Sequence, residues 1–156
     1  MSEIRGLSIR QPWAWAIAAG HKPVENRSWS PTYRGLIAIH ASGSDGPRLE
    51  REVAIDRIIT LTGLRHRQIS ERLVRSAILA VARLEAVCEE SPPYASAVAC
   101  ACGPWAVAGE KHIHIADVQK LPVPVPCKGA LGLWRLPDDR EAAVRGQLAE
   151  KEAGTR

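Results

Sequence analysis

Phenylalanine is absent from this chain of 156 residues, and tyrosine occurs only twice, so five tryptophans supply most of the aromatic side chains. No apolar run approaches the ~18 to 20 residues that a membrane span requires. The first five residues, Met-Ser-Glu-Ile-Arg, are too polar for a signal peptide. We therefore expect a globular protein of the cytoplasm that does not enter a membrane.

Several sequence motifs that are typical of particular enzyme classes are also absent. The sequence contains no phosphate-binding loop, no dinucleotide fingerprint and no Gly-x-Ser-x-Gly elbow. These absences argue against nucleotide-driven chemistry and against serine hydrolysis. There is no internal repeat and no low-complexity tract, and the length suits one domain with a core of its own.

Cysteine is scarce, and its spacing matches no recognised zinc or redox motif. The four cysteines are Cys88, Cys100, Cys102 and Cys127. A reducing cytoplasm disfavours disulfides, and Cys100-x-Cys102 lacks the two-residue spacing of zinc ribbons and thioredoxin-like motifs. Those two cysteines with His112 and His114 would offer four zinc ligands if a loop and a strand met. No spacing supports that meeting, so we expect no metal and no cofactor.

The charge is unevenly distributed along the chain. The formal net charge is +4, but residues 1–84 hold 13 Lys and Arg against 7 Asp and Glu, whereas residues 85–156 hold 8 against 10. A basic half suits a polyanionic partner, nucleic acid before membrane. The alternative is an arginine-rich surface that is simply solvated.

The hydrophobic pattern predicts an α+β fold built as a small mixed β-barrel. We expect strands at residues 4–9, 36–41, 77–87, 111–118 and 131–136, and a short extended piece from Val24. We expect a short plug helix from Pro12 that Gly20 ends, because proline suits a first helical turn and glycine a stop. Residues 89–104 read as a loop. Residues 121–129, with prolines alternating, read as an extended connector that must run along an edge.

A helical insert is expected at residues 47–75, in two pieces of which the second spans residues 66–75. The insert carries seven arginines, which form either a solvated face or a stripe that contacts phosphates. Residues 138–152 read as a polar helix with acidic residues at its start. We therefore expect a domain at residues 1–137 and a helical tail at residues 138–156, whose last few residues are disordered.

The residues from Gly20 to Trp29 carry the most chemistry. In an extended segment, side chains at i and i+2 share a face, so Glu25, Arg27 and Trp29 are predicted to point the same way into a small polar pocket. Lys22 is the only lysine among the first 110 residues. With Glu25 it could bind an oxyanion or, once desolvated, act as a general acid and base. Its alternative is an ordinary turn lysine.

Each remaining candidate residue could have a purely structural role instead of a functional one. Glu25 and Arg27 could form a structural ion pair, or could bind a base amino group and a phosphate or carbonyl. Trp29, with Trp13, Trp15 or Trp105, could stack on a base, which is worth about 1 to 3 kcal/mol. His40 is either a satisfied core histidine or, beside Ser42, a proton shuttle.

These residues resemble an ASCH domain. The resemblance spans about residues 4–137 and is carried by six segments: Leu7–Ala14, Gly20–Trp29, Tyr33–Gly35, Ile39–Ser42, Pro122–Gly129 and Gly132–Trp134. It implies a PUA-like β-barrel linked to RNA binding, with a cleft lined by a Gly-x-Lys-x-x-Glu-x-Arg segment. Here that segment supplies Gly20, Lys22, Glu25 and Arg27.

The resemblance leaves three functions open. The first is a module that takes a nucleobase or short single-stranded RNA into its cleft. The second is a hydrolase that uses Lys22 and Glu25, since some small relatives hydrolyse an acetylated cytidine and others cleave RNA. The deacylating relatives have a threonine nucleophile where this chain has Glu25, which argues against amidohydrolysis. The third is an adapter that binds protein through its insert and its proline-rich segment.

Overall fold

The computed structural model describes residues 2–89 and 101–155. Most of the predicted loop at residues 89–104, including Cys100, lies outside these ranges. The elements follow one another as β1 (Ile4–Ile9), α1 (Trp13–Ala18), β2 (Val24–Arg27), β3 (Gly35–Ala41), α2 (Arg48–Thr62), α3 (His66–Ser70), β4 (Ala77–Cys88), β5 (Lys111–Pro126), β6 (Leu133–Arg135) and α4 (Asp138–Ala153).

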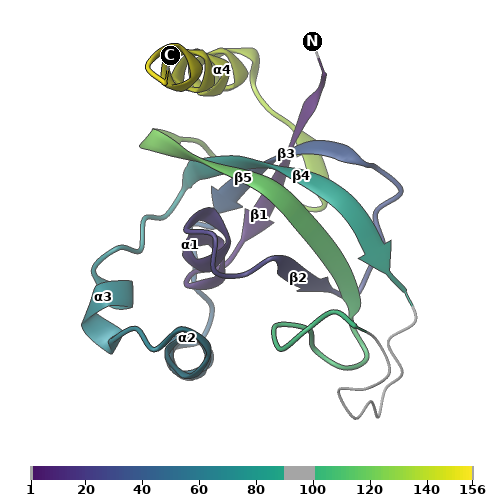
Figure 1. The fold of residues 1–156 in the computed structure, drawn as a ribbon, viewed down its shortest axis with the longest axis vertical. Coiled ribbons are helices and arrows are strands. Elements are labelled where there is room, and N and C mark those ends of the chain that lie inside the picture. Colours follow the sequence, from purple (N-terminus) through teal and green to yellow (C-terminus); the bar gives the residue numbers. More distant parts are fainter. Residues whose placement is uncertain (1, 90–100, 156) are drawn as a thin grey trace.

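One six-stranded sheet organises the molecule, in the order β2-β5-β4-β3-β1-β6. β1 and β3 run parallel, and every other neighbouring pair is antiparallel. β4 and β5 are long and lose register at three places, and such bulges bend a strand and increase its twist. The sheet therefore curls into a half-barrel, which confirms the predicted α+β barrel-like fold (Figure 1).

Helix α1 fills the inside of this curl as the predicted plug. Its residues 14–18 are all buried, and Ala14, Ile17 and Ala18 pack with inward side chains of β1, β3, β4 and β5. Gly20 follows with φ at +83°, a backbone conformation that costs glycine little and so ends the helix. The main core thus lies between α1 and the sheet.

The predicted helical insert forms α2 and α3, which stand beside α1 (Figure 1). A second core cluster joins them to α1 through Trp15, Ile55, Ile58 and Ile69. The second helical piece is shorter than predicted, since α3 ends at Ser70 rather than at residue 75. The Val74 carbonyl accepts a hydrogen bond of 2.7 Å from Gln11 Nε2 instead of continuing a helix, and the chain then enters β4.

The proline-rich segment is a strand rather than a connector, because β5 continues unbroken to Pro126. β2 pairs only with residues 111–114 of β5, so the prolines lie where β5 forms the edge of the sheet. Proline has no amide hydrogen to donate, and an edge tolerates that loss. The prediction of an edge position is confirmed. β6, by contrast, covers only residues 133–135 of the predicted 131–136.

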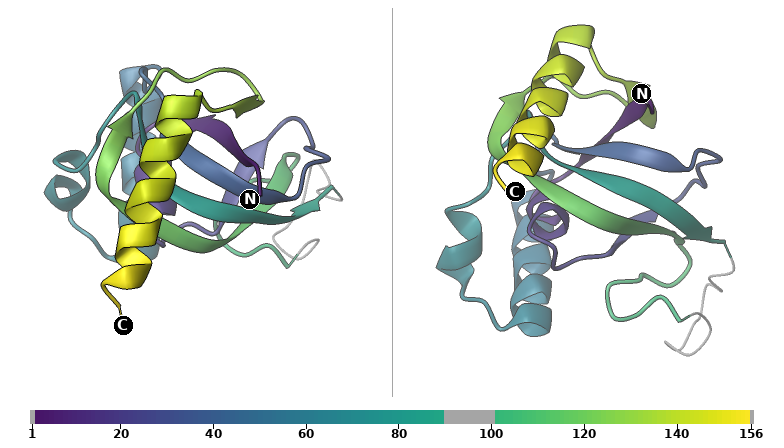
Figure 2. Two further views of the ribbon diagram at one scale, coloured as in Figure 1. Left: turned by 90° about the horizontal axis from the view of Figure 1, so that it is seen from above. Right: turned by 45° about the horizontal axis from the view of Figure 1, so that its top comes forward.

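Helix α4 lies across the end of β5 (Figure 2). Its helical state was predicted, but the helix is held to the sheet: Val144 is fully buried in a core cluster with Leu121 and Val125 of β5. The Gln147 side chain donates to the Val123 carbonyl and accepts from the Val123 amide, each at 2.9 Å. A helix side chain therefore caps the exposed edge of β5.

Across residues 2–89 and 101–155, no helix has both the length and the apolar character needed to cross a membrane. The cytoplasmic location stays a prediction.

Candidate functional site

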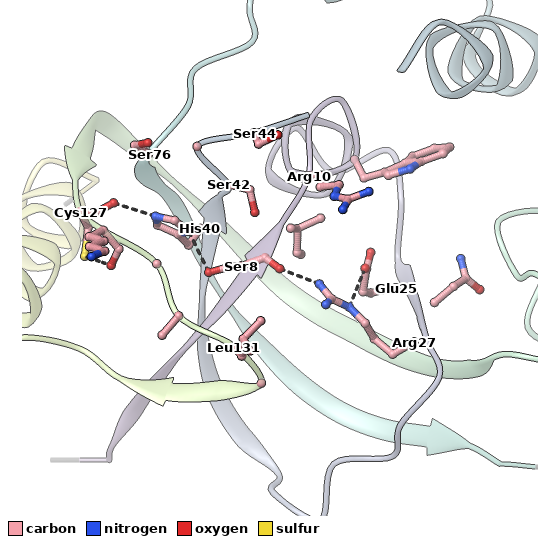
Figure 3. A pocket seen from close by; sticks show the side chains of 18 residues that line it. Ser8, Arg10, Glu25, Arg27, His40, Ser42, Ser44, Ser76, Cys127 and Leu131 are labelled. Atoms are coloured by element: carbon pink, nitrogen blue, oxygen red, sulfur yellow. Dashed lines mark hydrogen bonds and ion pairs between the residues drawn. The ribbon is translucent and has the colours of Figure 1, made fainter. Parts of the chain in front are cut away.

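A polar pocket of about 920 Å³ opens where β1, β2 and β3 approach the loop that follows β5 (Figure 3). Its walls combine strand ends and loop residues: Ser8, Ile9, Arg10, Trp13, Glu25, Asn26, Arg27, His40, Ser42, Gly43, Ser44, Ser76, Cys127, Lys128, Gly129, Ala130, Leu131 and Gly132. The volume falls in the range of small-molecule sites, about 300 to 1,000 Å³. Six of the seven predicted ligand-binding or catalytic residues lie in this wall or touch it.

Glu25 is the centre of the β2 wall. Its side chain is 9% exposed, and both carboxylate oxygens are occupied: Oε2 accepts from Lys22 Nζ at 3.1 Å and Oε1 accepts from Arg27 Nε at 3.0 Å. Arg27 also donates from its other side to the Ser8 carbonyl at 2.7 Å, which ties β2 to β1. The predicted shared face of Glu25 and Arg27 is therefore present, with the ion pair that the sequence left as one alternative.

Lys22 lies behind this wall rather than on it. It is 3% exposed, and its ammonium donates to the Val24 carbonyl and to Glu25, with the Trp13 ring 5.3 Å away. A lysine held in this way orients the carboxylate from the protein side. It is not among the residues that line the pocket.

Trp29, predicted to share a face with Glu25 and Arg27, lies beyond the end of their strand. β2 ends at Arg27, so the alternation of an extended strand does not reach residue 29. Trp29 packs instead against the main core cluster, and it is not among the lining residues. Trp13, at the start of α1, is the tryptophan that lines the pocket.

His40 lies at the base of the pocket with both ring nitrogens engaged (Figure 3). Nε2 is 2.8 Å from the Cys127 carbonyl, which can only accept, so Nε2 carries the proton. Nδ1 therefore accepts from the Ser8 hydroxyl at 3.0 Å, and that hydroxyl accepts from Trp134 Nε1 at 3.2 Å. Burial lowers the pKa of His40, which favours this neutral form.

Ser8 is a pocket residue that sequence reasoning missed. Ser42 lines the pocket near His40 in sequence, but the hydroxyl bonded to the imidazole belongs to Ser8. The parallel register of β1 and β3 sets Ser8 opposite His40, and such pairing cannot be read from local spacing. Gly129 closes over the pair so tightly that a Cβ there would lie 2.4 Å from Ser8 Oγ.

Positive charge exceeds negative charge in the pocket. Within residues 2–89 and 101–155, Arg10, Arg27 and Lys128 line it with one carboxylate, Glu25, which is already paired. Arg10 follows β1 and Lys128 follows the proline-rich strand, and neither stood out in the sequence. The arginines of the helical insert are not among the lining residues, and three of them are paired with carboxylates: Arg51, Arg67 and Arg75.

Potential metal ligands gather away from this pocket. One ligand atom from each of Cys88, Cys102 and His112 lies within 4.8 Å of the others. The zinc site weighed from the sequence also contained Cys102, His112 and His114, but its second cysteine was Cys100 and not Cys88. Cys88 lies opposite His112 in the β4–β5 register, which local spacing again could not show.

A curled half-barrel sheet with an inner plug helix and a polar pocket at its strand ends defines an ASCH-like α+β fold. The sequence of residues 7–124 matches the ASCH domain family, and the chain belongs to that family, which is associated with RNA binding.

Solved structures show the same fold. An ASCH protein from Zymomonas mobilis superimposes with a TM-score of 0.53 at 14% identity, covering 92% of this chain and 94% of that one. Two single-substitution mutants of the same Zymomonas mobilis protein match with TM-scores of 0.56 and 0.57, at 12% and 16% identity. These matches cover 93% and 92% of this chain, and 98% and 95% of the mutant chains. No curated protein matches the sequence.

Proposed function

We propose that this chain binds single-stranded RNA by taking one nucleotide into the polar pocket. The observation that carries the proposal is the charge of the lining. Among the described residues, three cations line the space with one carboxylate, Glu25, which Lys22 and Arg27 neutralise, while Arg10 also pairs with the exposed Glu50 at 3.6 Å. A cationic concave surface attracts phosphate. Hydroxyls of Ser42, Ser44 and Ser76 add neutral donors and acceptors for a base or a sugar.

In this proposal, different pocket residues contact different parts of the nucleotide. Arg27, held flat by Glu25 and by the Ser8 carbonyl, presents its guanidinium to a phosphate or a base carbonyl. Glu25 accepts from a base amino group, and Lys22 fixes its orientation from behind. Trp13 supplies the aromatic face for stacking, a role that the sequence assigned to Trp29 with Trp13, Trp15 or Trp105.

The test is binding of a fluorescently labelled single-stranded RNA, followed by anisotropy at increasing salt. We expect affinity to fall as salt rises, and we expect Arg27→Gln and Lys128→Gln to weaken binding and to reduce the salt slope by about one charge each. Arg72→Gln is the matched control, since Arg72 is an exposed arginine of the helical insert that does not line the pocket. Equal losses in Arg72→Gln and Arg27→Gln, or no binding at low salt, would contradict the proposal.

A second candidate is hydrolysis of a modified nucleoside or of an RNA phosphodiester in the same pocket. Two pairs could supply the proton transfers: Lys22 with Glu25, and Ser8 with the neutral His40 that it contacts at 3.0 Å. The second pair favours this candidate because a hydroxyl bonded to an oriented imidazole is the arrangement that activates a nucleophile. Turnover of an RNA or nucleoside panel that survives both Lys22→Met and His40→Asn would exclude both pairs.

A further inference from the structure

Three potential metal ligands from distant parts of the chain meet beside the end of β4. Cys88 is the last residue of β4, His112 is the second residue of β5, and Cys102 lies in the segment that precedes β5. One ligand atom from each lies within 4.8 Å of the other two. Cys88 and His112 are paired by the antiparallel register of their strands, so the sheet itself holds two of the donors together.

His114, outside this group of three, offers a further donor beside Cys102. Its Nε2 lies 3.2 Å from Cys102 Sγ. His114 follows His112 by two residues on β5, so both imidazoles leave the same face of the strand. Tetrahedral zinc with bonds of about 2.0 to 2.3 Å separates its ligand atoms by about 3.3 to 3.8 Å. The ligand atoms of Cys88, Cys102 and His112, which lie within 4.8 Å of one another, therefore need to approach by about 1 Å when an ion binds.

The His112 ring is already oriented for this role. It is 1% exposed, and its Nε2 donates to the Val107 carbonyl at 2.7 Å. Because a carbonyl can only accept, that bond places the proton on Nε2, so a metal would bind at Nδ1. Metal-ligating histidines commonly donate their other N–H to a carbonyl or carboxylate, which fixes the tautomer and the direction of the ring.

We propose that Cys88, Cys102, His112 and His114 bind one zinc ion that ties the segment before β5 to the sheet. Two thiolates and two imidazoles are the donor set of closed, structural zinc sites, and soft sulfur disfavours magnesium and calcium. Binding releases the thiol protons to solvent, since zinc takes thiolates. This inference stands independently of the nucleic-acid proposal.

The ion would also fix one wall of the polar pocket. The segment before β5 folds back beneath β2 in Figure 1, where Asn26 donates to the Trp105 carbonyl at 2.9 Å and accepts from the Val107 amide at 2.8 Å. The Trp105 ring meets Trp13 edge to face at 6.4 Å. Asn26 and Trp13 line the pocket, so a ligated Cys102 and His112 hold the backbone against which both residues rest.

The test measures metal in protein purified under reducing conditions with zinc supplied. Elemental analysis should find about one zinc per chain, and replacement by cobalt should give the thiolate-to-cobalt absorption of a site with cysteine ligands. Cys88→Ser and Cys102→Ser should each weaken zinc binding by more than about 100-fold, beyond the cost of losing an outer-shell partner. Cys127→Ser and His66→Ala are matched controls outside the cluster and should keep the zinc.

Two results would overturn the proposal. One is a folded wild-type protein that takes up neither zinc nor cobalt after full reduction. The other is a Cys88→Ser or Cys102→Ser protein that binds as tightly as the wild type. If a cysteine variant does not fold, His114→Ala is the test, because His114 is only half-buried and its removal should not unfold the protein. An unchanged cobalt spectrum and affinity in His114→Ala would contradict the four-ligand site. Weaker binding with an altered spectrum would support it.

Discussion

The Ser8 hydroxyl and the His40 imidazole meet at 3.0 Å across two parallel strands, although 32 residues separate them in sequence. The carbonyl of Cys127 holds the proton on the far ring nitrogen. We expect ¹⁵N NMR of the imidazole to show the Nε2–H tautomer. Because burial lowers the pKa of His40, the ring should stay neutral below the ordinary value of about 6.5. An Nδ1–H tautomer, or titration at or above that value, would contradict the assigned network.

Lys22 and Glu25 form a buried pair whose disruption should be costly. Lys22→Met leaves the Glu25 carboxylate buried with Arg27 as its remaining ionic partner. Removing one member of a buried pair typically costs about 3 to 5 kcal/mol, and the second cation reduces this, so we expect a loss of about 2 to 3 kcal/mol in urea unfolding. The double variant Lys22→Met with Glu25→Gln removes the stranded charge. It should be more stable than Lys22→Met alone, and a double variant that is less stable would refute this account.

Asp45 links the start of the helical insert to its end. Its side chain is 6% exposed and accepts from Arg75 Nε at 2.9 Å and from Arg51 at 3.4 Å. The Arg75 hydrogen bond, more than the other contacts, lowers the pKa of Asp45 below its ordinary value. The ionised Asp45 carboxyl therefore stabilises the folded state. This stabilisation is complete above a pH of about 4 and is lost as the pH falls further.

The Asp45→Asn protein should accordingly be less stable at pH 7 by about 1 to 2 kcal/mol. The difference from the wild type should shrink as the pH of the unfolding experiment falls below about 4. Asp56→Asn, an exposed residue of α2, is the control. A stability difference that does not change between pH 7 and pH 3 would show that ionisation of Asp45 is not its source.

Gly129 should tolerate no side chain. A Cβ there would lie 2.4 Å from Ser8 Oγ and 2.6 Å from His40 Cε1, so Gly129→Ala must push the loop away from the Ser8–His40 pair. We expect a loss of about 1 to 3 kcal/mol in stability. Gly146→Ala is the matched control, because Gly146 lies within α4 with open space around it and should gain up to about 1 kcal/mol. Similar effects of the two substitutions would contradict the close packing.

Local patterns predicted most of the elements because hydrophobic period and glycine or proline punctuation act over a few residues. The plug helix ended by Gly20 and the ion pair of Glu25 with Arg27 follow from such patterns. What could not be predicted depends on register between distant strands. The contacts of Ser8 with His40 and of Cys88 with His112 arise only when β1 meets β3 and β4 meets β5.

The proline-rich strand shows a different limit. Alternating prolines were correctly expected to need an edge, since they cannot donate to a neighbouring strand. A connector and an edge strand both avoid the missing donor, so the local sequence could not distinguish between them. The partner that decides between them is β4, which pairs Ile78 with Val125 and Ala77 with Pro126.

The carboxamide of Gln147 gives Val123 both of the hydrogen bonds that a neighbouring strand would give. At this point α4 stands in for another strand, and a second copy of the chain cannot extend the sheet there. Without that cover, an unprotected strand edge invites pairing between molecules. The C-terminal helix, which contributes no residue to the polar pocket, thereby blocks strand pairing between molecules at this edge.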